Sequence, residues 1–120
     1  MSARGEGVIQ AGDREVQVLF TNRALAEAED AMGKGIIGVA DGFSSGQTGI
    51  RDVAYLLRAG MEAARREARD GRRPITMVDA YAVLDDAGFS AVTMVVMTAV
   101  ADVLGYSANG ENEEAVDPNG

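Results

Sequence analysis

The longest apolar segment, residues 89–104, constrains the fold of this chain most strongly. It carries no charged residue before Asp102, so a helix built from it is apolar on more than one face and needs cover from other elements. The part 91–100 has enough β-branched residues for a strand, but its length, Ser90 as an N-cap and Gly105 as a terminator favour a helix. We predict a helix that is too short and too polar in places to span a bilayer.

The apolar content is sufficient for one small core. Leu, Ile, Val and Phe together occupy 27 of the 120 positions, which lies above the level at which charged chains stay disordered. The length indicates one domain, and we place it at 7–105. Residues 1–6 are predicted to be a flexible N-terminus, and 106–120 a disordered acidic tail that has almost no apolar anchors.

The N-terminal part of the domain has the pattern of a β-hairpin. Val16, Val18 and Phe20 alternate with other residues at a period near two, and turn chemistry at 11–14 separates them from an earlier apolar pair. An isolated hairpin is marginal in water, so its apolar face must cover something else. The predicted fold class is therefore α+β and mainly α-helical, with this hairpin followed by four or so helices.

Helical periodicity and capping signals predict the remaining elements. Helices are expected over 23–32, from about 48 to 69, and over 77–87, the last with a capping box at Thr76 and Asp79. The glycine-rich stretch 33–49 is expected to be a tethered loop with about one helical turn. The second helix is expected to bury a stripe of Ile50, Val53, Leu57, Gly60 or Met61, and Ala64, and the third a stripe of Met77, Ala80, Tyr81 and Leu84.

The chain contains no His and no Cys, which excludes most catalytic and metal-binding chemistry. Carboxylates such as Asp79 and Asp85 could bind Mg²⁺ in principle, but aspartates and glutamates are ordinarily exposed on the surface without a metal. The pattern GxGxxG at 33–38 follows a helix instead of a strand, so it does not match a dinucleotide site. We predict no catalytic, cofactor-binding or metal-binding residue, no cofactor, and no enzymatic activity.

The formal charge is −8, and only the segment 48–74 is basic, with seven arginines against four acids. The interleaved acids indicate a helix face with internal salt bridges, and argue against nucleic acid as a partner. No membrane partner is expected. The first residues are not followed by an apolar run of signal-peptide length, so we expect a cytoplasmic protein.

Three motifs in this order resemble one known family. Thr21 to Glu29 matches a "T-N-x-L-x-x-x-E" helix with one residue of slack, Leu56 to Met61 matches "LLxAGL" with Met in the last place, and Thr76 to Gly88 matches "T-x-x-x-A-x-x-L-D-x-x-G". With the preceding hairpin, they resemble the phage and gene transfer agent tail assembly chaperone family over about 7–104. The match is a pattern of small and apolar residues.

This resemblance implies a protein that keeps tape measure protein, tail tube subunits, or both, soluble in the host cytoplasm until the tail polymerises. Apolar strips would shield the client, and the candidate partner-binding residues are Leu56, Met61, Met94 and Met97. For the last helix, the pattern favours a purely structural core role over a docking strip. The alternatives are a head-tail or tail connector retained in the particle and a small Mg²⁺-dependent enzyme. A homo-oligomer stays open.

Overall fold

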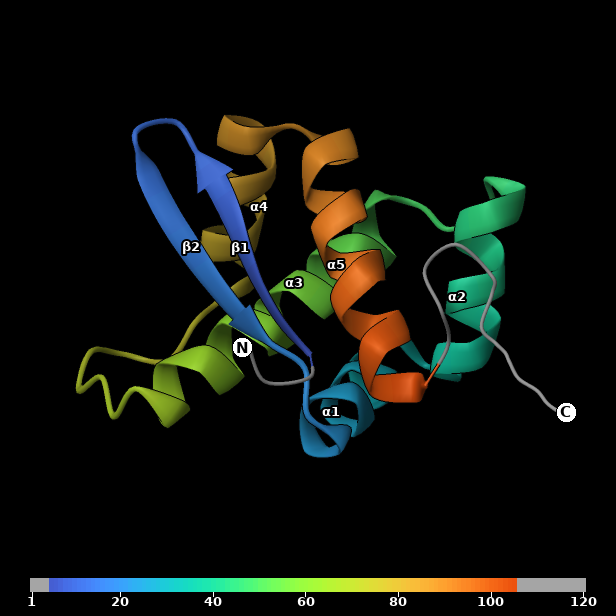
Figure 1. Cartoon of the computed structure of the whole chain (residues 1–120), viewed down its shortest axis with the longest axis horizontal. Helices are drawn as coiled ribbons and strands as arrows, with labels where there is room; N and C mark the ends of the chain where they lie inside the picture. Colours follow the sequence, from blue (N-terminus) through green and yellow to red (C-terminus); the bar gives the residue numbers. More distant parts are fainter. Residues whose placement is uncertain (1–4, 106–120) are drawn as a thin grey trace, which may run out of the picture.

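The computed structural model describes residues 5–105 and shows a β-hairpin packed against five helices (Figure 1). This confirms the predicted α+β, mainly helical class. The expected acidic tail at 106–120 and residues 1–4 of the expected N-terminal segment lie outside the described residues. The elements are β1 (Glu6–Ala11), β2 (Arg14–Leu19), α1 (Asn22–Met32), α2 (Ile36–Ser45), α3 (Ile50–Glu67), α4 (Met77–Ala87) and α5 (Phe89–Leu104).

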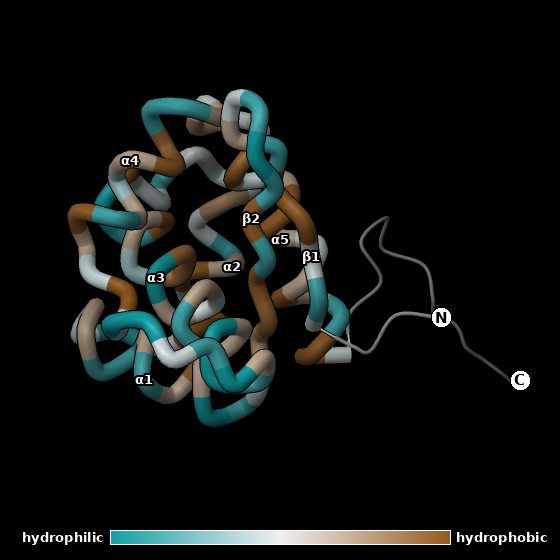
Figure 2. The backbone as a smooth tube through the Cα atoms, turned by 90° about the vertical axis from the view of Figure 1, so that its left-hand side faces the viewer, coloured by the Kyte–Doolittle hydropathy of each residue, from teal (hydrophilic) through white to brown (hydrophobic). Residues whose placement is uncertain are grey.

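The hairpin buries one face against the helices. Its strands are antiparallel, with Ile9 opposite Val16 and the turn at Gly12, whose φ is +66°. Ile9, Val16 and Val18 point inward and are buried, as the period-two pattern predicts. The hairpin contacts α3, α4 and α5, and Figure 2 shows hydrophobic stretches of β1, β2 and α5 lying together. These helices supply the cover that an isolated hairpin lacks.

Helix α3 is the central element of the fold. It contacts β2, α1, α4 and α5, and its Val53, Leu56 and Leu57 are fully buried. Ile50, which we expected in the buried stripe, is exposed because it is the first residue of the helix and precedes the part that the other elements cover. The predicted helix is therefore confirmed, with its apolar stripe shortened at the N-terminal end.

Phe20, at the exit of the hairpin, packs directly onto Gly60 in the middle of α3. A Cβ atom at Gly60 would lie 2.6 Å from Cζ of Phe20, closer than any real contact. Phe20 is itself among the largest fully buried side chains. The glycine therefore makes room for an aromatic ring from the hairpin, which offsets its poor helix propensity.

The glycine-rich stretch forms a complete helix, α2, and our expectation of a loop with about one turn was wrong. Oε2 of Glu29 accepts a hydrogen bond from Ile36 N at 2.8 Å and caps the start of the helix. The Thr48 hydroxyl donates to the carbonyl oxygen of Val39 at 2.7 Å, in space left by Gly42. A carboxylate from α1 and a hydroxyl from beyond the end of α2 thus stabilise a helix that its glycines disfavour.

The last two helices follow the predicted bounds. The capping box at Thr76 and Asp79 is present at the start of α4, and α5 is a helix, not a strand. Within α4, Val83 is buried where we expected Tyr81, which is exposed because β1, α3 and α5 cover the neighbouring face. Within residues 5–105 no single helix meets the length and hydropathy criteria for a membrane span; α4 and α5 meet them only as a pair bent by 115°.

The contact between Phe20 and Gly60 generates a stability prediction. Gly60→Ala adds a methyl group against the buried ring, and we expect the free energy of unfolding to fall by about 1–3 kcal/mol despite the better helix propensity of Ala. Gly38→Ala is the matched control, since Gly38 lies inside α2 with open space around it and should gain up to about 1 kcal/mol. Urea denaturation measures both changes, and a Gly60→Ala variant as stable as the parent would contradict this packing.

Candidate functional site

A groove of about 410 Å³ runs between β2, the C-terminal half of α3, the 70–75 loop and the start of α4. Met61 and Ala64 of α3, with Ile75 of the loop, give it an apolar floor. Arg72 and Arg73 of the loop also line it, together with their ion-pair partners Asp70 and Asp79. The groove thus has an apolar floor and a loop side made of two arginine–aspartate pairs.

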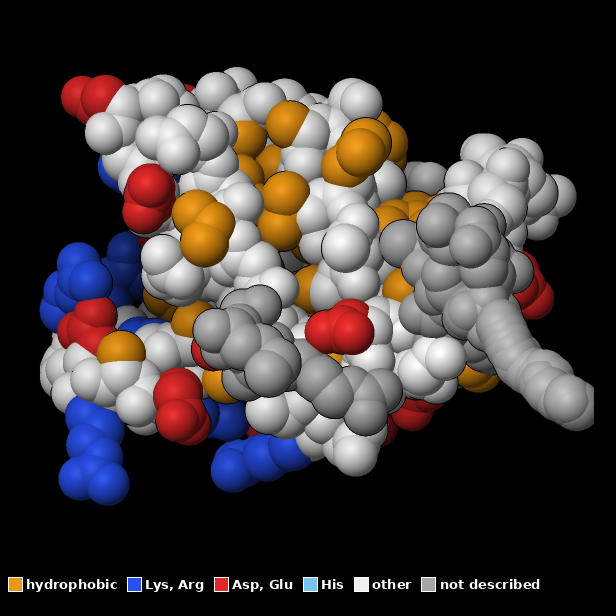
Figure 3. Space-filling model, in the orientation of Figure 1, with side chains coloured by type: hydrophobic (Ala, Val, Ile, Leu, Met, Phe, Trp, Pro, Cys, Tyr) orange, Lys and Arg blue, Asp and Glu red, His pale blue; other side chains and the backbone are white. Residues whose placement is uncertain are grey.

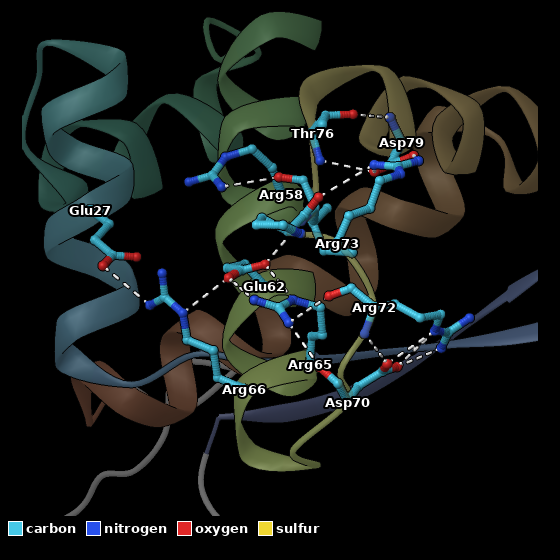
Figure 4. Close-up of polar contacts among 12 residues, drawn as sticks. Glu27, Arg58, Glu62, Arg65, Arg66, Asp70, Arg72, Arg73, Thr76 and Asp79 are labelled. Carbon is cyan, nitrogen blue, oxygen red and sulfur yellow. Dashed lines mark hydrogen bonds and ion pairs between the residues drawn. The ribbon is translucent and has the colours of Figure 1, made fainter.

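Glu62 holds the loop against α3. Its side chain is only 4% exposed, and its two carboxylate oxygens receive four hydrogen bonds, drawn in Figure 4. Arg65 binds it in a fork, with Nη2 to Oε2 at 2.7 Å and Nε to Oε1 at 2.9 Å. Arg66 Nε donates at 3.0 Å, and the backbone N of Ile75 at 2.9 Å. A buried carboxylate is tolerated when it is satisfied in this way.

Arg65 extends the same network into the loop. Its Nη1 donates to the carbonyl oxygens of Asp70 at 2.9 Å and Arg72 at 3.0 Å. One guanidinium therefore links the α3 carboxylate to two backbone positions of the loop. The side of the groove formed by the loop is held in place by Glu62 and Arg65 together.

Two further ion pairs stand along the rim of the groove. Arg72 Nε lies 3.0 Å from both carboxylate oxygens of Asp70, and this pair lowers the pKa of Asp70 to about 2. Arg73 forks onto Asp79 at 2.8 and 2.9 Å, and these hydrogen bonds, with that from the Thr76 backbone N–H, hold the pKa of Asp79 well below its usual range. Asp79 therefore both caps α4 and anchors the loop.

The predicted salt-bridge-rich helix face is confirmed, but its centre is not where we expected it. Glu62 is one of the acids interleaved with the arginines of 48–74, and the structure buries it. The reason is the convergence of Arg65, Arg66 and the backbone N of Ile75 on one carboxylate. The spacing of three and four residues from Glu62 to the two arginines signals an intrahelical pair, but nothing local indicates its burial.

The four predicted partner-binding residues do not share a surface. Leu56 is fully buried against neighbouring elements, so it presents nothing to a partner in the folded domain. Met61 is also buried, and the little that is accessible lies at the groove floor. Met94 is 67% exposed and Met97 is half-buried, both on α5. Of the four, Met94 and Met97 of α5 are accessible in the folded domain, and partner contact at these residues stays a prediction.

A second candidate surface follows α5. Its outward row contains Ala91, Met94 and Thr98, none of which is charged. Val8 is exposed on the outer face of the adjacent β1, and Figure 3 shows hydrophobic side chains over α5 and the hairpin on one side of the molecule. We call this surface the α5 face.

The other motifs of the sequence have structural roles. Gly33 ends α1, and Gly35 precedes α2, whose first free N–H is bound by the Glu29 carboxylate and not by an external anion. In the part of the chain that the structure describes, no three His, Cys, Asp or Glu side chains are grouped so that they could hold a metal ion.

The Glu62 network generates a stability prediction. Glu62→Gln keeps the shape of the side chain and removes the charge that pairs with Arg65 and Arg66. We expect the free energy of unfolding at neutral pH to fall by about 3 kcal/mol, because removing one charge of a buried pair leaves the other without its partner. Glu67→Gln, on an exposed position of the same helix, should change it by less than about 0.5 kcal/mol in denaturant unfolding. Equal effects of the two substitutions would contradict the structural role of Glu62.

The same carboxylate generates a pH prediction. The pKa of Glu62 is lowered from 4.5 to about 2, chiefly by the hydrogen bond from Arg65. Because the folded state favours the ionised form, this stabilisation is fully present above pH 4.5 and is lost as the pH falls towards 2. The stability difference between the parent and Glu62→Gln should therefore shrink between about pH 5 and about pH 3 in denaturant titrations. A difference that stays constant over this range would rule the mechanism out.

Comparison with known proteins covers almost all of this domain. A family model described as phage tail tube protein, GTA-gp10, matches residues 4–105, which include the hairpin and all five described helices. No curated protein and no solved structure matches the chain. The expected relation to phage and gene transfer agent tail proteins is thereby confirmed at the level of the family. The chain belongs to the phage tail tube protein GTA-gp10 family.

Proposed function

We propose that this chain is a tail assembly chaperone that binds tape measure protein, tail tube subunits, or both, and keeps them soluble until the tail polymerises. The observation that carries the proposal is the α5 face, where Met94 is 67% exposed among uncharged neighbours. Membership of a phage tail family supports tail proteins as the partners. Work of this kind would take place in the host cytoplasm, before the particle is complete.

Shielding of an apolar client explains the proposed activity physically. An exposed apolar row on a helix can cover the apolar side of a client helix, and an unbranched Met side chain adapts to different shapes. The net charge of −8 would keep the complex apart from other complexes. The proposed function needs no catalytic group, which suits a chain without His or Cys.

The second candidate is a structural tail component that stays in the particle, as a tube or connector subunit. The description of the matching family as a tail tube protein favours it. Mass spectrometry of purified particles separates the two functions. A stoichiometric amount of this chain in finished tails would support the structural role, whereas its absence, together with client binding before assembly, would support the chaperone.

Co-expression tests the chaperone proposal. Co-expressed tape measure and tail tube proteins should be more soluble when this chain is present, and Met94→Asp should reduce that effect at least about tenfold by placing a charge in an apolar contact. Val78→Asp is the matched control, since Val78 is an exposed apolar residue on α4. The soluble client fraction after centrifugation is the readout, and circular dichroism confirms that both variants fold.

Two results would contradict the chaperone proposal. Both clients could be equally soluble without this chain, or neither could co-purify with it. An equal loss of client solubility in the Met94→Asp and Val78→Asp variants would instead remove the α5 face as the contact surface.

A further inference from the structure

One wall of the groove is the free edge of a strand. Among residues 5–105, β2 pairs only with β1. Four consecutive residues of β2, from Arg14 to Gln17, line the groove. Successive strand residues point to opposite faces of a sheet, so four in a row line a groove only along the strand edge. Backbone N–H and C=O groups on that edge are available to a further strand.

The floor of the groove suits the side chains of such a strand. Ala64 of α3 and Ala68, which follows its last residue, are small, and Met61 and Ile75 complete an apolar surface beside the edge of β2. In an added strand every second side chain would point towards this floor. The added strand and β2 both advance about 3.3 Å per residue, so an edge of four residues pairs with about four residues of a peptide.

The rim presents positive charge outward. The Arg72 side chain is 85% exposed while its partner Asp70 is 24% exposed, and Arg73 is 66% exposed over Asp79 at 23%. The acids therefore lie beneath their arginines, and an incoming chain meets the guanidinium groups first. Figure 3 shows Lys and Arg side chains gathered at the end of the molecule that carries the C-terminal end of α3.

We propose that this groove binds an extended acidic segment of a partner protein, which joins the edge of β2 as a third strand. Backbone pairing with β2 would supply binding that tolerates many sequences, and the arginine rim would select acidic residues. Nucleic acid fits less well, because the groove also contains Glu15 and its other wall is a strand edge suited to a peptide backbone. The groove is separate from the α5 face, so this inference goes beyond the proposed chaperone contact and does not depend on it.

A synthetic peptide with alternating valine and acidic residues, acetyl-Glu-Val-Asp-Val-Glu-Val-Asp-amide, is the probe. Added to the isotope-labelled full chain, it should shift the NMR amide signals of Glu15 and Gln17 on β2. The same peptide with lysines in place of its acids should bind at least about tenfold more weakly at low salt. A version with alternate backbone nitrogens methylated should lose binding by a similar factor, since it cannot pair with a strand edge.

Substitution of the rim arginines provides a second test of the proposal. Arg72→Glu combined with Arg73→Glu should weaken peptide binding at least about tenfold in fluorescence anisotropy. Arg51→Glu is the matched control, because Arg51 is exposed on α3 and does not line the groove. The methylated peptide needs no change in the protein, so it tests the edge even if the double variant folds poorly.

Five outcomes would overturn the proposal. Equally strong binding of the lysine peptide would rule out selection of acidic residues. Equally strong binding of the methylated peptide would rule out strand pairing. If a thymidine oligonucleotide displaced the bound peptide as well as unlabelled peptide does, the groove would bind anions in general and would not be specific for a peptide. Shifts of the β2 amides on deletion of 106–120 would assign the groove to the chain's own C-terminal segment. A dimer that the rim substitutions abolish would assign it to a second copy.

Discussion

The buried carboxylate of Glu62 is the interaction on which the polar half of this structure depends. An ionised side chain that is 4% exposed is costly unless every acceptor position is filled, and here two arginines and one backbone N–H fill them. Because Arg65 also binds two loop carbonyls, satisfying the carboxylate fixes the path of the 70–75 loop. That path delivers Arg73 to Asp79 and so sets the start of α4.

Most of the fold is predictable because its signals are local. Turn chemistry and alternation identify the hairpin, and the capping box at Thr76 marks the start of α4. Helix α2 is not predictable in this way, since it depends on a carboxylate from α1 and on a hydroxyl from the residue that follows its C-terminal turn. Likewise, the burial of Glu62 requires the backbone N of Ile75, thirteen positions away. Local propensity contains no information about either contact.

The candidate surfaces show the same division. Periodicity identifies the apolar stripes of α3 and α5 but not which of them the hairpin covers. The hairpin lies over α3, where Phe20 meets Gly60, and Leu56 and Met61 of this helix are buried. It covers only one side of α5, where Val95 lies against Gly7, and leaves Met94 outside. The distinction between core and docking methionine therefore depends on tertiary packing.

An exposed strand edge is a liability, because any extended chain can pair with it. In this molecule the edge of β2 lies beside a loop that Glu62 and Arg65 hold in place, and this loop presents the exposed side chains of Arg72 and Arg73 above their aspartate partners. The network that stabilises the domain thus also restricts what can reach the edge. A bulky or basic segment is disfavoured there by shape and by charge, whereas a slim acidic one is not. Stability and selectivity at this surface then have a common origin in one buried carboxylate.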